Sequence, residues 1–129
     1  MNHLKTKTLA CAGVLLVALV SSAQYPAQPP DATARADARI FDRVRRDVDR
    51  AAALTQPNSG DRDRLEVARN EVNECARIVA GGTYDRRIFG QMMDALQRVL
   101  DLNQLSKVNR DRLVDDMSAL REIQARLER

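Results

Sequence analysis

The five residues Asp37–Phe41 (Asp-Ala-Arg-Ile-Phe) recur as Asp85–Phe89 (Asp-Arg-Arg-Ile-Phe). The four residues Arg62–Leu65 (Arg-Asp-Arg-Leu) recur unchanged as Arg110–Leu113. Both recurrences have the same offset, since 85 − 37 = 48 and 110 − 62 = 48. A fixed period of this size is typical of a repeated structural unit. The sequence therefore predicts two tandem copies of one unit, at residues 37–80 and 85–128.

The two predicted copies share identical residues at 12 of 44 positions when they are aligned without a gap. The polar identities could mark two equivalent ligand or partner sites. The favoured interpretation is that these residues cap and clamp the ends of the hairpins. An acid suits the first turn of a helix, and arginine can bridge to a neighbouring helix. The polar identities in question are Arg39 and Arg87, Arg62 and Arg110, Asp63 and Asp111, and Arg64 and Arg112, four of the polar pairs that recur.

Apolar residues at three- and four-residue spacing predict four helices, and no stretch has the two-residue period of a strand. The expected spans are about 37–55, 60–80, 84–103 and 107–129, with Ser59 or Asn58, Thr83 and Ser106 as N-caps and Gly81-Gly82 as a helix stop. Short loops make successive helices antiparallel neighbours. We predict an all-α fold in which a tandem duplicated αα-hairpin closes as an antiparallel four-helix bundle at 37–129. The alternative is two hairpins side by side that complete their core by dimerising.

The first 23 residues have the pattern of a signal peptide. Lys5 and Lys7 precede the apolar run Leu9–Val20, and Ser21–Ala23 supplies the small residues of a cleavage site. The run is short for a membrane span, although an uncleaved anchor is the alternative. Residues 24–36 are rich in Pro and Ala and predict a disordered tether. We therefore expect an exported protein, periplasmic or extracellular, with no membrane span after cleavage.

Removal of the predicted signal peptide takes away Lys5 and Lys7 and no acid. The formal net charge then falls from +3 to 19 − 18 = +1. Each predicted helix carries both signs, and no basic stripe is evident in the sequence. A nucleic-acid binder normally has such a stripe. The charge pattern therefore predicts no nucleic-acid partner.

Residue types that carry common chemistry are scarce. His3 is the single histidine and belongs to the predicted signal peptide. A chain without it has no histidine base or histidine metal ligand. The carboxylate pairs Glu71/Glu74 and Asp115/Asp116 are interpreted as solvated helix faces. We predict no catalytic residue, no cofactor and no metal site.

Cys75 is the single cysteine outside the signal peptide. Its counterpart 48 residues on is Ile123, which predicts a buried core thiol. The alternative is a redox thiol or an intermolecular disulfide. Met93 replaces the outward-facing Arg45 of the first copy, and with Tyr84 it is the candidate interface for an unknown protein partner or for self-association.

The pattern Arg-Asp-Arg-Leu-x-x-Asp-x-x-x-Leu-Arg at Arg110–Arg121 resembles a group of small exported bacterial α-helical proteins that have no assigned activity. The resemblance implies a helical fold and export, and it transfers no catalytic residue. The expected function is a non-catalytic interaction or structural module. One alternative is a periplasmic stress or chaperone-like protein. Another is a small all-helical enzyme of the chorismate mutase type, which needs arginines and Glu or Gln converging inside the bundle.

Overall fold

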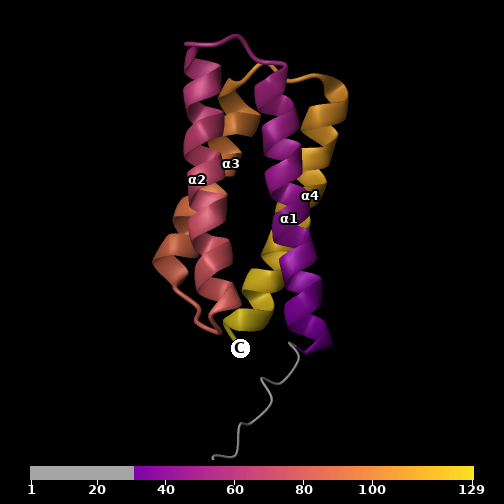
Figure 1. Cartoon of the computed structure of the whole chain (residues 1–129), viewed down its shortest axis with the longest axis vertical. Coiled ribbons are helices and arrows are strands. Elements are labelled where there is room, and N and C mark those ends of the chain that lie inside the picture. The colour runs from indigo at the N-terminus through magenta and orange to yellow at the C-terminus, as the bar shows by residue number, and fades with distance from the viewer. Residues whose placement is uncertain (1–30) are drawn as a thin grey trace, which may run out of the picture.

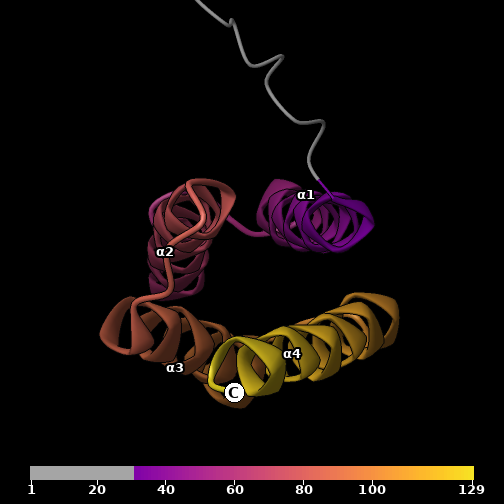
Figure 2. The ribbon, with the colours of Figure 1, turned by 90° about the horizontal axis from the view of Figure 1, so that it is seen from below.

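The computed structural model describes residues 31–129, which form four α-helices. The predicted signal peptide and residues 24–30 of the predicted tether lie outside this range. The helices are α1 (Ala32–Ala53), α2 (Gly60–Ala80), α3 (Arg86–Leu102) and α4 (Lys107–Leu127). Each packs against two others, α1 and α3 both lying against α2 and α4 (Figures 1 and 2). The predicted all-α fold and its four-helix bundle are confirmed. Within residues 31–129, no helix has the length and apolar character needed to cross a membrane.

The helix starts show how short polar side chains set the boundaries. Ser59 and Ser106 cap α2 and α4 as predicted, their hydroxyl oxygens accepting from the backbone N–H of Arg62 and Asn109, both at 3.2 Å. A side-chain acceptor at this position satisfies a backbone donor that has no partner inside the helix. Gly81 and Gly82 end α2 as expected, with Gly82 in the left-handed region at φ +78°.

Two predicted helix starts are wrong. α1 begins at Ala32, so residues 32–36 of the predicted tether are helical. The carboxylate of Asp31 caps this start by accepting from the N–H of Ala34 at 2.6 Å, and the alanines that follow favour helix. α3 begins at Arg86 with Asp85 as N-cap, and not with Thr83. The N–H of Thr83 donates to the carbonyl of Ile78, so Thr83 still belongs to the turn that closes α2.

The core consists of the apolar stripes of all four helices. Phe41 and Phe89, which are equivalent in the predicted repeat, are 2% and 0% exposed. Five further pairs of buried apolar residues occupy matching positions in the two halves: Val44 and Met92, Val48 and Leu96, Leu65 and Leu113, Val72 and Leu120, Cys75 and Ile123. A single chain buries these positions without a second copy, so the core does not need the dimer that was the alternative.

Two matching arginines hold the loop end of the bundle together. Arg62 donates from Nη1 to the carbonyl of Ala52, and Arg110 donates from Nη1 to the carbonyl of Leu100, both at 2.7 Å. Each carbonyl lies near the C-terminal end of the preceding helix, where backbone acceptors lack helical partners. The structural interpretation of Arg62 and Arg110 as clamps is therefore supported by their contacts.

Candidate functional site: a pocket at the open end of the bundle

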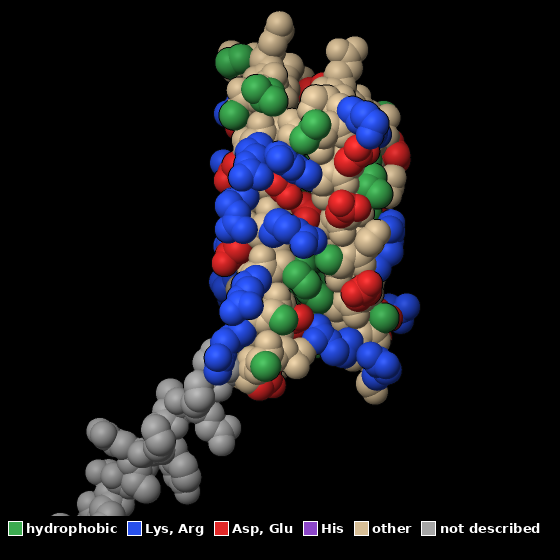
Figure 3. All heavy atoms as spheres, turned by 90° about the vertical axis from the view of Figure 1, so that its right-hand side faces the viewer, with side chains coloured by type: hydrophobic (Ala, Val, Ile, Leu, Met, Phe, Trp, Pro, Cys, Tyr) green, Lys and Arg blue, Asp and Glu red, His purple; other side chains and the backbone are tan. Residues whose placement is uncertain are grey.

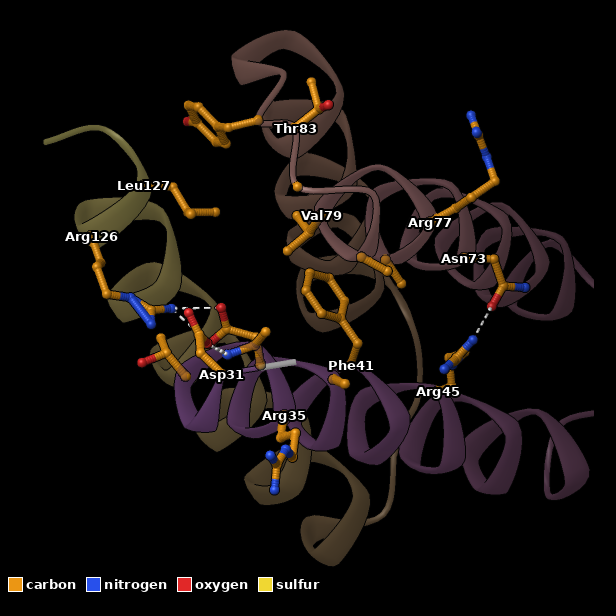
Figure 4. A pocket seen from close by; sticks show the side chains of 18 residues that line it. Asp31, Arg35, Phe41, Arg45, Asn73, Arg77, Val79, Thr83, Arg126 and Leu127 are labelled. Atoms are coloured by element: carbon orange, nitrogen blue, oxygen red, sulfur yellow. Dashed lines mark hydrogen bonds and ion pairs between the residues drawn. The ribbon is translucent and has the colours of Figure 1, made fainter. Parts of the chain in front are cut away.

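A pocket of about 680 Å³ lies at the end of the bundle opposite the α1–α2 and α3–α4 loops. Its walls are the first turns of α1, the end of α2 with the turn that follows it, and the last turn of α4. Phe41, Val79 and Leu127 point into this space from three different helices (Figure 4). Ala38 and the ring of Tyr84 also line it. The size and the apolar lining are those of a ligand pocket.

The charged groups on the rim of the pocket have partners within the chain. Arg126 donates from Nη2 to both carboxylate oxygens of Asp37, at 2.6 and 2.8 Å. Arg45 binds Asp42 and lies 3.5 Å from the side-chain oxygen of Asn73. Because these charges are already matched, a molecule entering the pocket does not have to bring a counter-charge.

Arg77 of α2 lines the edge of the pocket and pairs with Glu74 at 2.7 Å. The hydrogen bond from Arg77 lowers the pKa of Glu74. Tyr84 donates from its hydroxyl to Glu128 at 2.6 Å, and burial is the main cause that raises the pKa of this phenol. Each of these contacts fixes a side chain at the pocket mouth. None of them places a free acid and a free base side by side over the apolar floor.

Metal ligation is not suggested by the described part of the chain. In residues 31–129 no three His, Cys, Asp or Glu side chains lie together in a way that could hold an ion. The predicted absence of a metal site or cofactor stays a prediction. The arrangement of the pocket is suited to holding an apolar group.

The candidate interface residues are both half-buried. Tyr84 packs against Phe89, with ring centroids 5.9 Å apart, and Met93 packs against the core. Tyr84 lines the pocket, and Met93 does not. The structure therefore does not bring the two into one exposed patch, and only Tyr84 belongs to the candidate site. The sequence missed the pocket because its lining comes from three chain segments that are far apart.

The other recurring polar residues differ between the two halves. Arg64 donates from Nε to Asn103 at 2.6 Å and from Nη2 to Asp61 at 2.6 Å, which links α2 to the α3–α4 loop. Its counterpart Arg112 is exposed. Arg39, Arg87, Asp63 and Asp111 are also exposed. Asp111 pairs with Lys107, and Arg87 with Gln91. These positions do not form two equivalent sites.

A row of arginines on α1 contradicts the expectation that the chain has no basic stripe. The spacings of 4, 4, 3 and 4 residues keep five exposed arginines on one helix face. These are Arg35, Arg39, Arg43, Arg46 and Arg50. The face formed by α1 and α4 shows such side chains beside acidic ones (Figure 3). The balance of charges in the sequence hid this row, because two acids of α1, Asp37 and Asp47, are buried.

Part of this positive charge is compensated inside the chain, since Arg43 pairs with Asp116 and Arg50 with Asp47. Asp116 was expected on a solvated face with Asp115. That expectation is wrong, because Asp116 is 1% exposed whereas Asp115 is exposed. The absence of a nucleic-acid partner stays a prediction.

Cys75 is buried, 2% exposed, on the inner face of α2, so the expected core position is confirmed. Burial, together with the nearby negative charges of Asp85, Glu71 and Glu74, raises the pKa of its thiol to about 12. The reactive form of cysteine is the thiolate. We therefore expect alkylation by iodoacetamide at pH 8 to be at least about 100-fold slower in the folded protein than in urea. Equal rates, followed by mass spectrometry, would contradict the buried position.

No protein-family model, curated protein or solved structure matches this chain. The resemblance to small exported helical proteins therefore stays a prediction.

Proposed function

We propose that the protein is an exported, non-catalytic binding module that receives an apolar group of its partner in the pocket at the open end of the bundle. The observation that carries this proposal is the pocket of about 680 Å³ with an apolar floor and a rim of internally paired charges. Water in an apolar pocket is displaced favourably by an apolar group. The paired charges on the rim of the pocket can orient a ligand, and they do not require the ligand to be charged.

We also propose that the bundle was built by duplicating one hairpin. The shared offset of 48 residues supports this, because buried apolar residues and the two arginine clamps recur at the same interval. The signal-peptide pattern of residues 1–23 supports the proposal that the protein is exported. We further propose that the protein acts in the periplasm or outside the cell.

A chaperone-like role is the second candidate, and it would use the same apolar pocket. The two roles differ in the number of partners, because a chaperone accepts many unfolded chains and an interaction module accepts one. A capture experiment from envelope and culture fractions, with the native protein and its Ala38→Phe variant, separates them. One partner that is lost with Ala38→Phe supports the module. A broad set of unfolded proteins supports the chaperone.

An enzyme of the chorismate mutase type is disfavoured by the placement of the arginines. Four of them line the pocket: Arg35, Arg45, Arg77 and Arg126. Three of these pair with acids of the chain, and the centre of the bundle is filled by apolar side chains. A dianionic substrate would have to break those pairs. Prephenate formation from chorismate by the purified protein would reverse this preference.

The direct test of the pocket uses a neutral apolar dye, N-phenyl-1-naphthylamine, whose fluorescence rises in apolar surroundings. We expect saturable binding at one site per chain. Ala38 lines the pocket and is exposed, so Ala38→Phe fills the space without disturbing the core. This variant should weaken dye binding at least about tenfold, or about 1.4 kcal/mol.

Ala36→Phe provides the matched control. Ala36 is also exposed, lies two residues away on the same helix and does not line the pocket. Its affinity for the dye should stay within about twofold of the native value, or about 0.4 kcal/mol. If both variants lost affinity for the dye equally, or if both kept it, the pocket would be rejected as the binding site.

A further inference from the structure

Two carboxylates from different helices lie buried inside the bundle. Asp47 of α1 is 5% exposed and Asp116 of α4 is 1% exposed. Asp116 Oδ1 accepts from Arg43 Nε at 2.7 Å, and Asp47 Oδ1 accepts from Arg50 Nη1 at 3.0 Å. The second oxygen of Asp116, Oδ2, is buried and has no hydrogen-bond partner among the residues that the structure describes. A buried acceptor without a donor is unfavourable, and a buried acid commonly responds by holding its proton.

The matching seam on the other side of the bundle has no such acids. The positions 48 residues away are Ala95, since 47 + 48 = 95, and Ala68, since 116 − 48 = 68. Both alanines are buried, on α3 and α2, which pack against each other. The bundle therefore closes one seam with small apolar residues at these positions. Packing alone does not require the buried acid pair of the α1–α4 seam, and this pair adds ionisable groups to that seam.

The charges that act on Asp116 come from α1. Burial raises the pKa of Asp116, the hydrogen bond from Arg43 opposes this rise, and the negative charge of Asp47 adds to it, which together give a pKa of about 6. Arg50 in turn contacts Asp47. Of the described residues, those of α3, the other helix packed against α4, contribute no charged group that acts on Asp116. The two carboxylates and the two arginines form one charge cluster on a single seam.

We propose that Asp116 holds a proton that fastens α4 to α1 through Asp47, so that the α1–α4 seam loosens when this proton leaves. With the proton on Oδ2, Asp116 can donate a hydrogen bond to the carboxylate of Asp47. This satisfies the unpartnered oxygen and removes the repulsion between two buried negative charges. When the proton leaves, Oδ2 again lacks a hydrogen-bond partner and the two buried negative charges again repel each other. Arg43 and Arg50 offset these costs only in part.

The direction in which stability changes with pH follows from the raised pKa of Asp116 in the folded protein. The carboxyl group of Asp116 has a pKa of 3.8 in its ordinary state and about 6 in the folded protein. Between these two values the folded state binds more protons than the unfolded state, so the contribution to stability decreases as pH rises. It is fully present below about pH 4 and is lost above about pH 6. Each unit of pKa difference changes the unfolding equilibrium tenfold, which gives about a hundredfold here.

The test measures urea unfolding between pH 4 and pH 7.5 for the native protein, for Asp116→Asn and for Asp115→Asn. Asp115 is the exposed neighbour of Asp116, so its variant is matched in charge and in position. We expect the unfolding constant of the native protein to rise by about a hundredfold relative to Asp116→Asn across this range. Asp115→Asn should follow the native curve. The carboxyl ¹³C signal of Asp116 should titrate near pH 6.

A second variant, Asp47→Ala with Asp116→Ala, covers the case in which Asp116→Asn folds poorly. It copies the alanines of the other seam and should lose the same pH dependence. Titration of Asp116 below pH 4.5 in the native protein would overturn the proposal. So would parallel stability curves for the native protein and the double variant. The inference does not depend on the binding role of the pocket, which the dye titration tests separately.

Discussion

Replacing Phe89 with alanine is expected to lower the free energy of unfolding by about 3–5 kcal/mol. Phe89 of α3 is fully buried and belongs to the core that all four helices share. Its removal forfeits the burial of a large apolar side chain and leaves a cavity that the packed neighbours can fill only partly. Urea unfolding followed by circular dichroism at 222 nm measures the difference.

Leu54→Ala is the control for this substitution. Leu54 is 78% exposed at the end of α1, so its side chain contributes little buried area. The expected change in unfolding free energy is within about 0.5 kcal/mol. If Phe89→Ala were as mild as Leu54→Ala, the helices could not be packed as the structure has them.

The ion pair between Asp37 and Arg126 is expected to have the second largest effect. The Asp37 side chain is 10% exposed and that of Arg126 is 33% exposed, and the pair ties the start of α1 to the end of α4. Arg126→Met keeps the apolar stem and removes the charge, which leaves the Asp37 carboxylate without its partner. We expect a loss of about 2–3 kcal/mol, because a buried carboxylate is costly when it is unpaired.

A double-mutant cycle with Asp37→Asn isolates the interaction between the two side chains. The coupling should be about 1–2 kcal/mol. The exposed pair Lys107–Asp111 is the control, since a solvated pair on one helix should give a coupling below about 0.5 kcal/mol. Equal coupling in the two cycles would show that the Asp37–Arg126 pair is not shielded from solvent.

The helical part of the fold could be predicted because its signals are local. The stripe spacing, the serine caps at Ser59 and Ser106 and the stop at Gly81-Gly82 all lie within one or two helical turns of the boundaries they define. The helix starts at Ala32 and Arg86 were not predicted, for different reasons. Pro29-Pro30 indicate a non-helical segment, and yet Asp31, which follows them directly, caps a helix. Thr83 is a favourable N-cap residue, but its N–H donates to Ile78 in the turn that closes α2.

The buried acids could not be predicted from the same patterns. Asp37, Asp47 and Asp116 sit among charged residues in the sequence, and their burial depends on arginines from another helix or another turn. One signal was present in the repeat, because Asp47 and Asp116 each align with an alanine. The repeat predicted an outward position for Met93, which was paired with Tyr84 as an interface, but only Tyr84 lines the pocket.

The measurement that tests the binding role most directly is methyl ¹³C NMR of the native protein during titration with N-phenyl-1-naphthylamine. The pocket contains the methyl groups of Ala38, Val79 and Leu127, and the opposite end of the bundle carries Leu54 and the exposed Leu102. We predict saturable shifts at Ala38, Val79 and Leu127, with Leu54 and Leu102 unchanged. Shifts centred on Leu54 and Leu102, or spread evenly over all methyl groups, would contradict a binding site at the open end of the bundle.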